Sequence, residues 1–201
     1  MTIAAPPTPL LADRVHRIGT EAAFALGALI AEVEAKGERV IRCNLGQPDF
    51  PVPKHITDAV KRALDAGLTT YCDPQGIPEL RAAVARSLSE KHGLDIGPER
   101  VVVYPGGRPA IGFAHMTYSE AGEEVIYPSP GYPLFESFVA YFRCSPVPVV
   151  LREKDGFGLS RAALEPLLSE KTGLIFLNFP SNPTGGVATR TQLAELSEVI
   201  L

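Results

Sequence analysis

The chain has 201 residues, of which 45% are hydrophobic and 21% are charged, a balance typical of a soluble globular protein with a substantial core. Its formal net charge of −4 argues against a nucleic acid or an anionic membrane as partner. No apolar run approaches the roughly 18 residues that a membrane span needs, and no secretory signal is evident at the N-terminus.

The cysteines Cys43, Cys72 and Cys144 are odd in number and widely spaced. This pattern predicts reduced thiols in a cytoplasmic protein rather than a disulfide framework. The histidines are equally scattered, and none lies at metal-ligand spacing from a cysteine. We therefore predict no metal site and assign no histidine a catalytic role.

The N-terminal 50 residues predict an arm followed by one helix and one short strand. Residues 1–19 are first rich in proline and then mixed, which is typical of an arm. The helix is expected over residues 20–36, with Thr20 or Glu21 as its cap and Gly37 at its end. Residues 39–45 alternate like a strand before a proline-containing turn.

Two amphipathic helices are expected next, over residues 54–66 and 78–92. In each, apolar residues recur every fourth position, and a glycine follows the last turn. The apolar positions are Ile56, Val60 and Leu64 in the first helix and Leu80, Val84 and Leu88 in the second. An irregular polar loop, residues 69–76, joins the two.

After Pro98 strands and helices alternate. Strands are expected at residues 101–104, 124–127, 147–151 and 174–179, and helices at 105–122, 132–143, 160–168 and from 191 onward. Such alternation predicts an α/β fold, a three-layer sandwich with a mostly parallel sheet between helices. The last helix keeps its apolar period to Leu201 without a C-cap, so we expect an incomplete domain of a longer protein.

Several turns follow expected strands and offer groups that could bind a ligand. Gly106 and Gly107 precede a helix, where free amides and the helix dipole favour a phosphate, and Arg108 would add charge. Tyr132 could stack on a flat ring, or simply belong to the core. Asn182 places a side-chain amide at the carboxyl end of a buried strand, where open α/β sheets bind ligands, or lies in an ordinary turn.

Two further residues lie in earlier loops. The Tyr71 hydroxyl could bind an anion or anchor its loop, and Gly46 could let a backbone amide approach a carboxylate or simply end a strand. An anion cradle, a stacking ring and an amide donor together suit a flat, phosphorylated aromatic cofactor.

In their order and spacing these segments resemble the class I/II aminotransferases, fold type I enzymes that use pyridoxal 5′-phosphate. The resemblance runs from about Asn44 to the end of the chain and depends on five short motifs. These are Gly46-Gln47-Pro48-Asp49-Phe50, Tyr71 with Gly76-Ile77-Pro78-Glu79-Leu80-Arg81, Gly106-Gly107-Arg108-Pro109-Ala110, Pro128-Ser129-Pro130-Gly131-Tyr132 and Asn182-Pro183-Thr184-Gly185-Gly186.

The resemblance implies a role for each site residue. Gly106, Gly107 and Arg108 would bind the cofactor phosphate, Tyr132 would stack on its ring, and Asn182 would donate to its phenolic oxygen. Tyr71 would reach the phosphate in a neighbouring subunit, which implies a homodimer with shared sites. Gly46, with Asn182, would bind the substrate. A cis peptide bond before Pro183 is also implied.

The resemblance also implies domains and a reaction. Residues 20–50 would begin a smaller domain, and residues 51–201 would form the first part of the large cofactor-binding domain. The reaction would move an amino group between an amino acid and a 2-oxo acid. In the family the Schiff-base lysine lies beyond the position of residue 201, so we assign no catalytic residue here and expect activity only in a full-length chain.

Two alternatives to an aminotransferase remain open. The chain could be a truncated, non-catalytic protein that binds the cofactor or a partner. It could also belong to a lyase or decarboxylase that uses the same cofactor on the same fold.

Overall fold

The computed structural model describes residues 11–19 and 22–201. The chain forms two compact units, one that joins the N-terminal residues up to Glu32 with Arg108–Leu201, and one that spans Val33–Gly107. Residues 1–10 of the predicted arm, and the predicted capping residues Thr20 and Glu21, lie outside the described residues. The predicted domain boundaries at residues 19 and 50 stay predictions.

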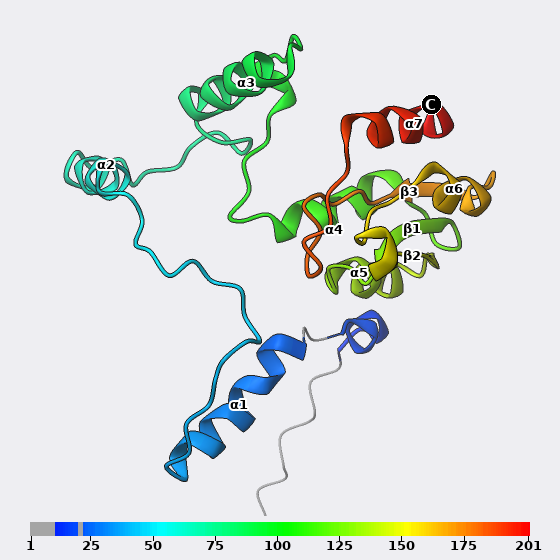
Figure 1. Cartoon of the computed structure of the whole chain (residues 1–201). Helices are drawn as coiled ribbons and strands as arrows, with labels where there is room; N and C mark the ends of the chain where they lie inside the picture. Colours follow the sequence, from blue (N-terminus) through cyan, green and yellow to red (C-terminus); the bar gives the residue numbers. More distant parts are fainter. Residues whose placement is uncertain (1–10, 20–21) are drawn as a thin grey trace, which may run out of the picture. The chain divides into compact units, whose positions relative to one another are not determined.

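The first unit contains a parallel sheet of β1 (Glu124–Ser129), β2 (Ser145–Val150) and β3 (Thr172–Ile175). The strand order is β2-β1-β3 (Figure 1). Glu124 pairs with Ser145 on one side and Thr172 on the other, and the register with β3 shifts after Glu124. Since β1 is central and parallel to both neighbours, the carboxyl ends of all three strands lie at one edge of the sheet.

Helices cover both faces of this sheet, because alternate residues of β1 point to opposite faces. Val125 and Tyr127 pack with α5 (Leu134–Phe142) and with Ile111 of α4 (Arg108–Tyr118). Ile126 packs on the other face with residues of α6 (Arg161–Leu164) and α7 (Arg190–Ile200). The predicted three-layer α/β arrangement is therefore confirmed.

Local hydrogen bonds set the ends of several helices. The Ser160 hydroxyl accepts from the amide of Ala163 and caps α6, and Ser160 is the first residue of the helix predicted over residues 160–168. Thr189 and Gln192 form a capping box at the start of α7. The chain also contains the short 3-10 helices η1 (Asp13–Arg17), η2 (Pro98–Arg100), η3 (Glu153–Asp155) and η4 (Glu165–Leu167).

The second unit contains α2 (Lys54–Asp65) and α3 (Pro78–His92), and α1 (Ala22–Ala35) crosses the division between the units. Arg81 of α3 donates from Nε to the carbonyl oxygens of Pro98 and Val101, both at 3.1 Å, and so ties the helix to the segment that follows it. The apolar face of α2 is exposed, with Val60 at 55% and Leu64 at 59%. No helix in residues 11–19 and 22–201 is long and apolar enough to cross a membrane.

Several predicted elements differ from those observed, among them the helix predicted over residues 160–168, which is α-helical over Arg161–Leu164 and continues as the 3-10 helix η4. Residues 39–45 and 101–104 are not strands. The amide of Val103 donates to the carbonyl of Gln75, which lies in a loop. This apolar run is therefore bonded to a loop and not to a neighbouring strand. The helix expected to end at residue 122 ends at Tyr118. The strand expected over residues 174–179 is observed as β3, which ends at Ile175.

His115 of α4 is fully buried in an aromatic cluster. Its ring stacks on Phe142, with centroids 5.4 Å apart, and lies 5.3 Å from the ring of Phe176. The Ser119 hydroxyl donates to the His115 carbonyl at 3.0 Å, so it accepts from Nδ1, which lies 3.2 Å away. Within the described part of the chain, Nε2 is buried and has no hydrogen-bond partner. The network therefore fits a neutral imidazole with its proton on Nδ1.

This arrangement predicts a pH-dependent stability. Burial lowers the pKa of His115. Below about pH 6.5 the unfolded chain binds a proton at this histidine that the folded chain does not, so stability falls as the pH drops. We expect His115→Phe to reduce that slope by up to about 1.4 kcal/mol per pH unit, measured by urea unfolding between pH 5 and pH 7.

The control for this experiment is His55→Gln, which removes an exposed histidine on α2. This variant should keep the wild-type slope. A His115→Phe protein with native circular dichroism and an unchanged slope would contradict the assignment of a neutral buried imidazole.

Candidate functional site

Three of the predicted site residues lie in the first unit, at or after the ends of its elements. Arg108 is the first residue of α4, and Tyr132 lies between β1 and α5. Asn182 follows β3, the parallel neighbour of β1. Since β1 and β3 end at the same edge of the sheet, their loops start from adjacent positions.

Arg108 and Tyr132 are in direct contact. The Arg108 Nε–H group donates a hydrogen bond of 2.9 Å to the Tyr132 hydroxyl. The guanidinium carbon also lies 5.4 Å from the ring centroid of Phe24, within the range of a cation–π contact. The two residues predicted to hold a phosphate and a ring are therefore adjacent in this structure.

The Tyr132 ring is supported from the sheet side by other aromatic residues. It packs edge-to-face on Phe135 at 5.8 Å, and Phe135 stacks on Phe176 at 4.6 Å. Phe135 comes from the first turn of α5 and Phe176 directly follows β3, so this row joins the start of α5 to the end of β3. Burial, and then the Glu136 carboxylate, raise the pKa of Tyr127, which packs in the same cluster as Phe135.

The turn that contains Asn182 is held by its own backbone. The amide of Ser181 donates to the carbonyl of Gly186, and the amide of Gly185 donates to the carbonyl of Ser181, both at 2.7 Å. The Asn182–Pro183 peptide bond is cis, as the resemblance implied. Asn182 is exposed, whereas Ser181 is buried and its Oγ has no hydrogen-bond partner among the described residues.

The remaining predicted site residues belong to the second unit. Gly106 has a left-handed φ of 88°, and a Cβ at Gly107 would meet nothing within 4 Å, so their backbone is open immediately before Arg108. Tyr71 and Gly46 are exposed. The structure thus joins Arg108 to Tyr132, whereas a role for these four residues beside them remains a prediction.

Sequence reasoning missed several residues of this region. Phe135 and Phe176 lie inside the predicted helix 132–143 and the predicted strand 174–179, and their aromatic character is the one local signal for a contact with Tyr132. Ser181 directly precedes Asn182, but its burial results from packing and cannot be recognised from the neighbouring sequence. The contact between Phe24 and Arg108 joins distant parts of the chain, and no local pattern indicates it.

The family model described as aminotransferase class I and II matches residues 38–201. An aspartate/prephenate aminotransferase from Cereibacter sphaeroides is 36% identical over 191 residues, which cover 95% of this chain and 48% of that protein. An aspartate aminotransferase from Sulfolobus acidocaldarius is 37% identical over 166 residues, covering 82% of this chain and 42% of that protein.

Solved structures give the same result. A Thermus thermophilus aspartate aminotransferase with maleate is similar with a TM-score of 0.89 at 31% identity, over 96% of this chain and 50% of that chain. An alanine aminotransferase from Pyrococcus furiosus is similar with a TM-score of 0.89 at 28% identity, over 94% of this chain and 49% of that chain. The chain spans about half the length of the curated relatives it matches. The resemblance and fold class predicted from the motifs are confirmed, and the chain belongs to the class I and II aminotransferase family.

Proposed function

We propose that this chain forms the cofactor-binding part of a pyridoxal 5′-phosphate-dependent aminotransferase. The complete protein would move an amino group between an amino acid and a 2-oxo acid, as a cytoplasmic homodimer with shared sites. The observation that best supports this proposal is the hydrogen bond between Arg108 and Tyr132, at the start of α4. It brings a cation and a supported aromatic ring together at one place in the first unit.

The residues present fit this cofactor. The N-terminus of α4, where the helix dipole favours an anion, directly follows the open backbone of Gly106 and Gly107, and this arrangement is typical of a phosphate site. The Tyr132 ring is braced by Phe135, which suits stacking on a flat ring. Ser181 has a buried hydroxyl with no partner among the described residues, beside the amide of Asn182, as a site for a polar ligand would provide.

Each residue would have a distinct task. The amides at Gly106 and Gly107, with the Arg108 guanidinium, would hold the phosphate, joined by Tyr71 of a second subunit. Tyr132 would cover the ring, Asn182 would donate to its phenolic oxygen, and Gly46 with Asn182 would position the substrate. When bound, the cofactor supplies an electron sink for the substrate's α-carbon. The rigid turn around Asn182 would keep its amide oriented without reorganisation.

The names of the relatives suggest a first substrate to test. The curated relatives include aspartate and aspartate/prephenate aminotransferases. We therefore propose aspartate as the amino donor to assay first in the full-length protein, with a 2-oxo acid as acceptor.

Cofactor binding provides the direct test of the proposed site. Arg108→Gln removes the guanidinium, and we expect the affinity for pyridoxal phosphate to fall roughly 10- to 100-fold, because a hydrogen bond to a charged group contributes about 1.5–3 kcal/mol. Tyr132→Phe keeps the ring and should have a smaller effect, whereas Tyr132→Ala should weaken binding more. Calorimetry on the full-length protein measures these affinities without depending on turnover.

Arg86→Gln is the matched control, since Arg86 is an exposed arginine on α3 and the net charge changes equally. It should leave the affinity unchanged. Equal affinities in the wild type, Arg108→Gln and Tyr132→Ala would exclude this site as the one that binds the cofactor.

A further inference from the structure

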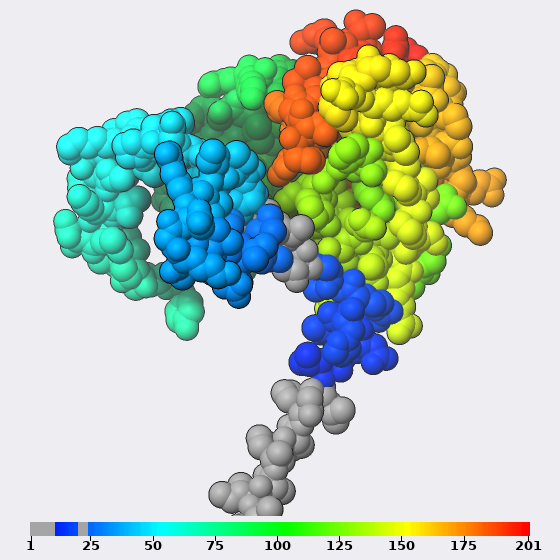
Figure 2. Space-filling model, turned by 60° about the horizontal axis from the view of Figure 1, so that its bottom comes forward, coloured from blue at the N-terminus to red at the C-terminus, as the bar shows by residue number. Residues whose placement is uncertain are grey.

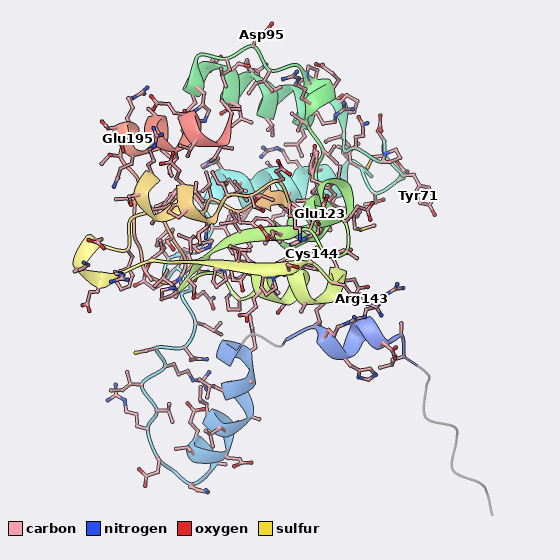
Figure 3. The ribbon with its side chains drawn as sticks, turned by 90° about the vertical axis from the view of Figure 1, so that its right-hand side faces the viewer. Tyr71, Asp95, Glu123, Arg143, Cys144 and Glu195 are labelled. Atoms are coloured by element: carbon pink, nitrogen blue, oxygen red, sulfur yellow. The ribbon has the colours of Figure 1, made fainter. Side chains whose placement is uncertain are left out.

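A cavity of about 560 Å³ lies in the first unit between η1 and the C-terminal end of α5. Three arginines line it, Arg14 and Arg17 from η1 and Arg143 from the residue after α5. The space-filling view shows the dark blue η1 segment against the rest of this unit (Figure 2), and the stick view labels Arg143 beside η1 (Figure 3). The volume is within the range of roughly 300–1,000 Å³ typical of small-molecule sites.

The arginines around this cavity outnumber its acidic residues by three to one, since Asp13 is the acidic residue in its lining. Among residues 11–19 and 22–201, none of the three guanidinium groups forms an ion pair, although Asp13 lines the same cavity. The Nε–H group of Arg17 is buried and has no hydrogen-bond partner in the same residues. A buried donor without an acceptor is unfavourable, and a ligand oxygen would satisfy it.

Local contacts position the Arg14 side chain and the Arg143 backbone. The Arg14 guanidinium carbon lies 5.9 Å from the ring centroid of Tyr141, which also lines the cavity. Arg143 has a left-handed φ of 61°, and its carbonyl accepts from the amide of Gly122 at 2.9 Å. The backbone at this end of α5 is therefore fixed to the amino end of β1, and the cavity has a defined rim.

A purely structural role explains only part of this arrangement. A cation after the last turn of α5 interacts favourably with the helix dipole, which accounts for Arg143. It does not account for two more arginines that come from a separate segment and converge on the same cavity. Guanidinium groups have donors arranged in a fork that matches phosphate and carboxylate oxygens.

We propose that this cavity binds a small multivalent oxyanion, a diphosphate or a polycarboxylate, through Arg14, Arg17 and Arg143. The cavity lies by the end of α5 and therefore at the amino ends of the strands, at the opposite edge of the sheet from Tyr132. The Arg17 Nε–H group donates to the anion, and the Tyr141 ring forms one wall.

Calorimetry on the full-length protein tests the proposal, with inorganic pyrophosphate and citrate as separate probes. Arg17→Gln and Arg143→Asn should each weaken binding about 10- to 100-fold, because each removes a charged donor. Asparagine is chosen at residue 143 because it tolerates the left-handed backbone. Arg17→Lys should give an intermediate loss, since it keeps the charge but not the fork. A response to pyrophosphate alone identifies a phosphate site, and one to citrate alone a carboxylate site.

Two controls separate this site from other anion binding. Arg152→Gln removes an exposed arginine of the same unit that does not line the cavity, and it should leave the affinity within twofold. Arg108→Gln should also leave it within twofold, so this site and the proposed cofactor site can fail independently. The proposal is overturned if neither probe binds at 10 mM, or if binding is unchanged in folded Arg17→Gln and Arg143→Asn variants.

Discussion

Gly131→Ala is expected to destabilise the protein by roughly 3 kcal/mol and to weaken cofactor binding as well. A Cβ at this position would lie far inside van der Waals contact with the carbonyl oxygen of Pro128. That oxygen belongs to the backbone of buried β1, so it cannot rotate away as a side chain could. The strand end must shift, and Tyr132, the next residue, must move with it.

Urea unfolding measures the loss of stability, and calorimetry with pyridoxal phosphate measures the second effect. The matched control is Gly27→Ala, because an alanine Cβ in α1 would meet nothing within 4 Å. This variant should be neutral, or more stable by about 0.5–1 kcal/mol. If the unfolding free energy of Gly131→Ala were within about 0.5 kcal/mol of the wild-type value, the close approach to Pro128 would not constrain the chain.

Ile126→Ala is expected to cost about 3–4 kcal/mol of unfolding free energy, within the usual range of 2–5 kcal/mol for such truncations. Ile126 is fully buried in the centre of β1 and packs with Val149, Leu164 and Leu196. Hydrogen bonds to β2 and β3 hold its backbone from both sides. The cavity left by the truncation therefore cannot close easily. The loss of unfolding free energy then exceeds the transfer free energy of the removed atoms, because the cavity adds its own cost.

The control is Val150→Ala on the same sheet, where the side chain is 62% exposed. This change should stay within about 0.5 kcal/mol of the wild type. Both variants should keep the wild-type dependence of stability on urea concentration, since the fold is retained. An Ile126→Ala loss below 1 kcal/mol would mean that the cluster around β1 is not tightly packed.

Local signals in the sequence were sufficient for most helices. The predicted helix at residues 78–92 has the observed bounds of α3, because Pro78 suits the first turn and Gly93 adopts the left-handed conformation that ends it. The predicted helix 160–168 likewise begins at Ser160, which is the N-cap of α6. These features depend on neighbouring residues only, so they can be recognised without knowledge of the fold.

Strands depend on partners, and here sequence reasoning was less successful. Residues 101–104 have a β-branched, apolar sequence, yet no strand in the described part of the chain pairs with them, and the Val103 amide bonds to a loop carbonyl. The candidate site shows the same limit. Motif order indicated Arg108, Tyr132 and Asn182, but the hydrogen bond between the first two depends on how α4 and the segment after β1 pack.

The exposed apolar face of α2 has a consequence for how the molecule opens. A helix of 12 residues is close to the shortest that persists alone in water, and this one has Val60 and Leu64 more than half exposed. Its backbone bonds can therefore break by fraying while the rest of the fold stays intact. Amide protons in α2 would exchange with solvent on a fast local timescale, whereas those of β1 would exchange only when the whole sheet comes apart.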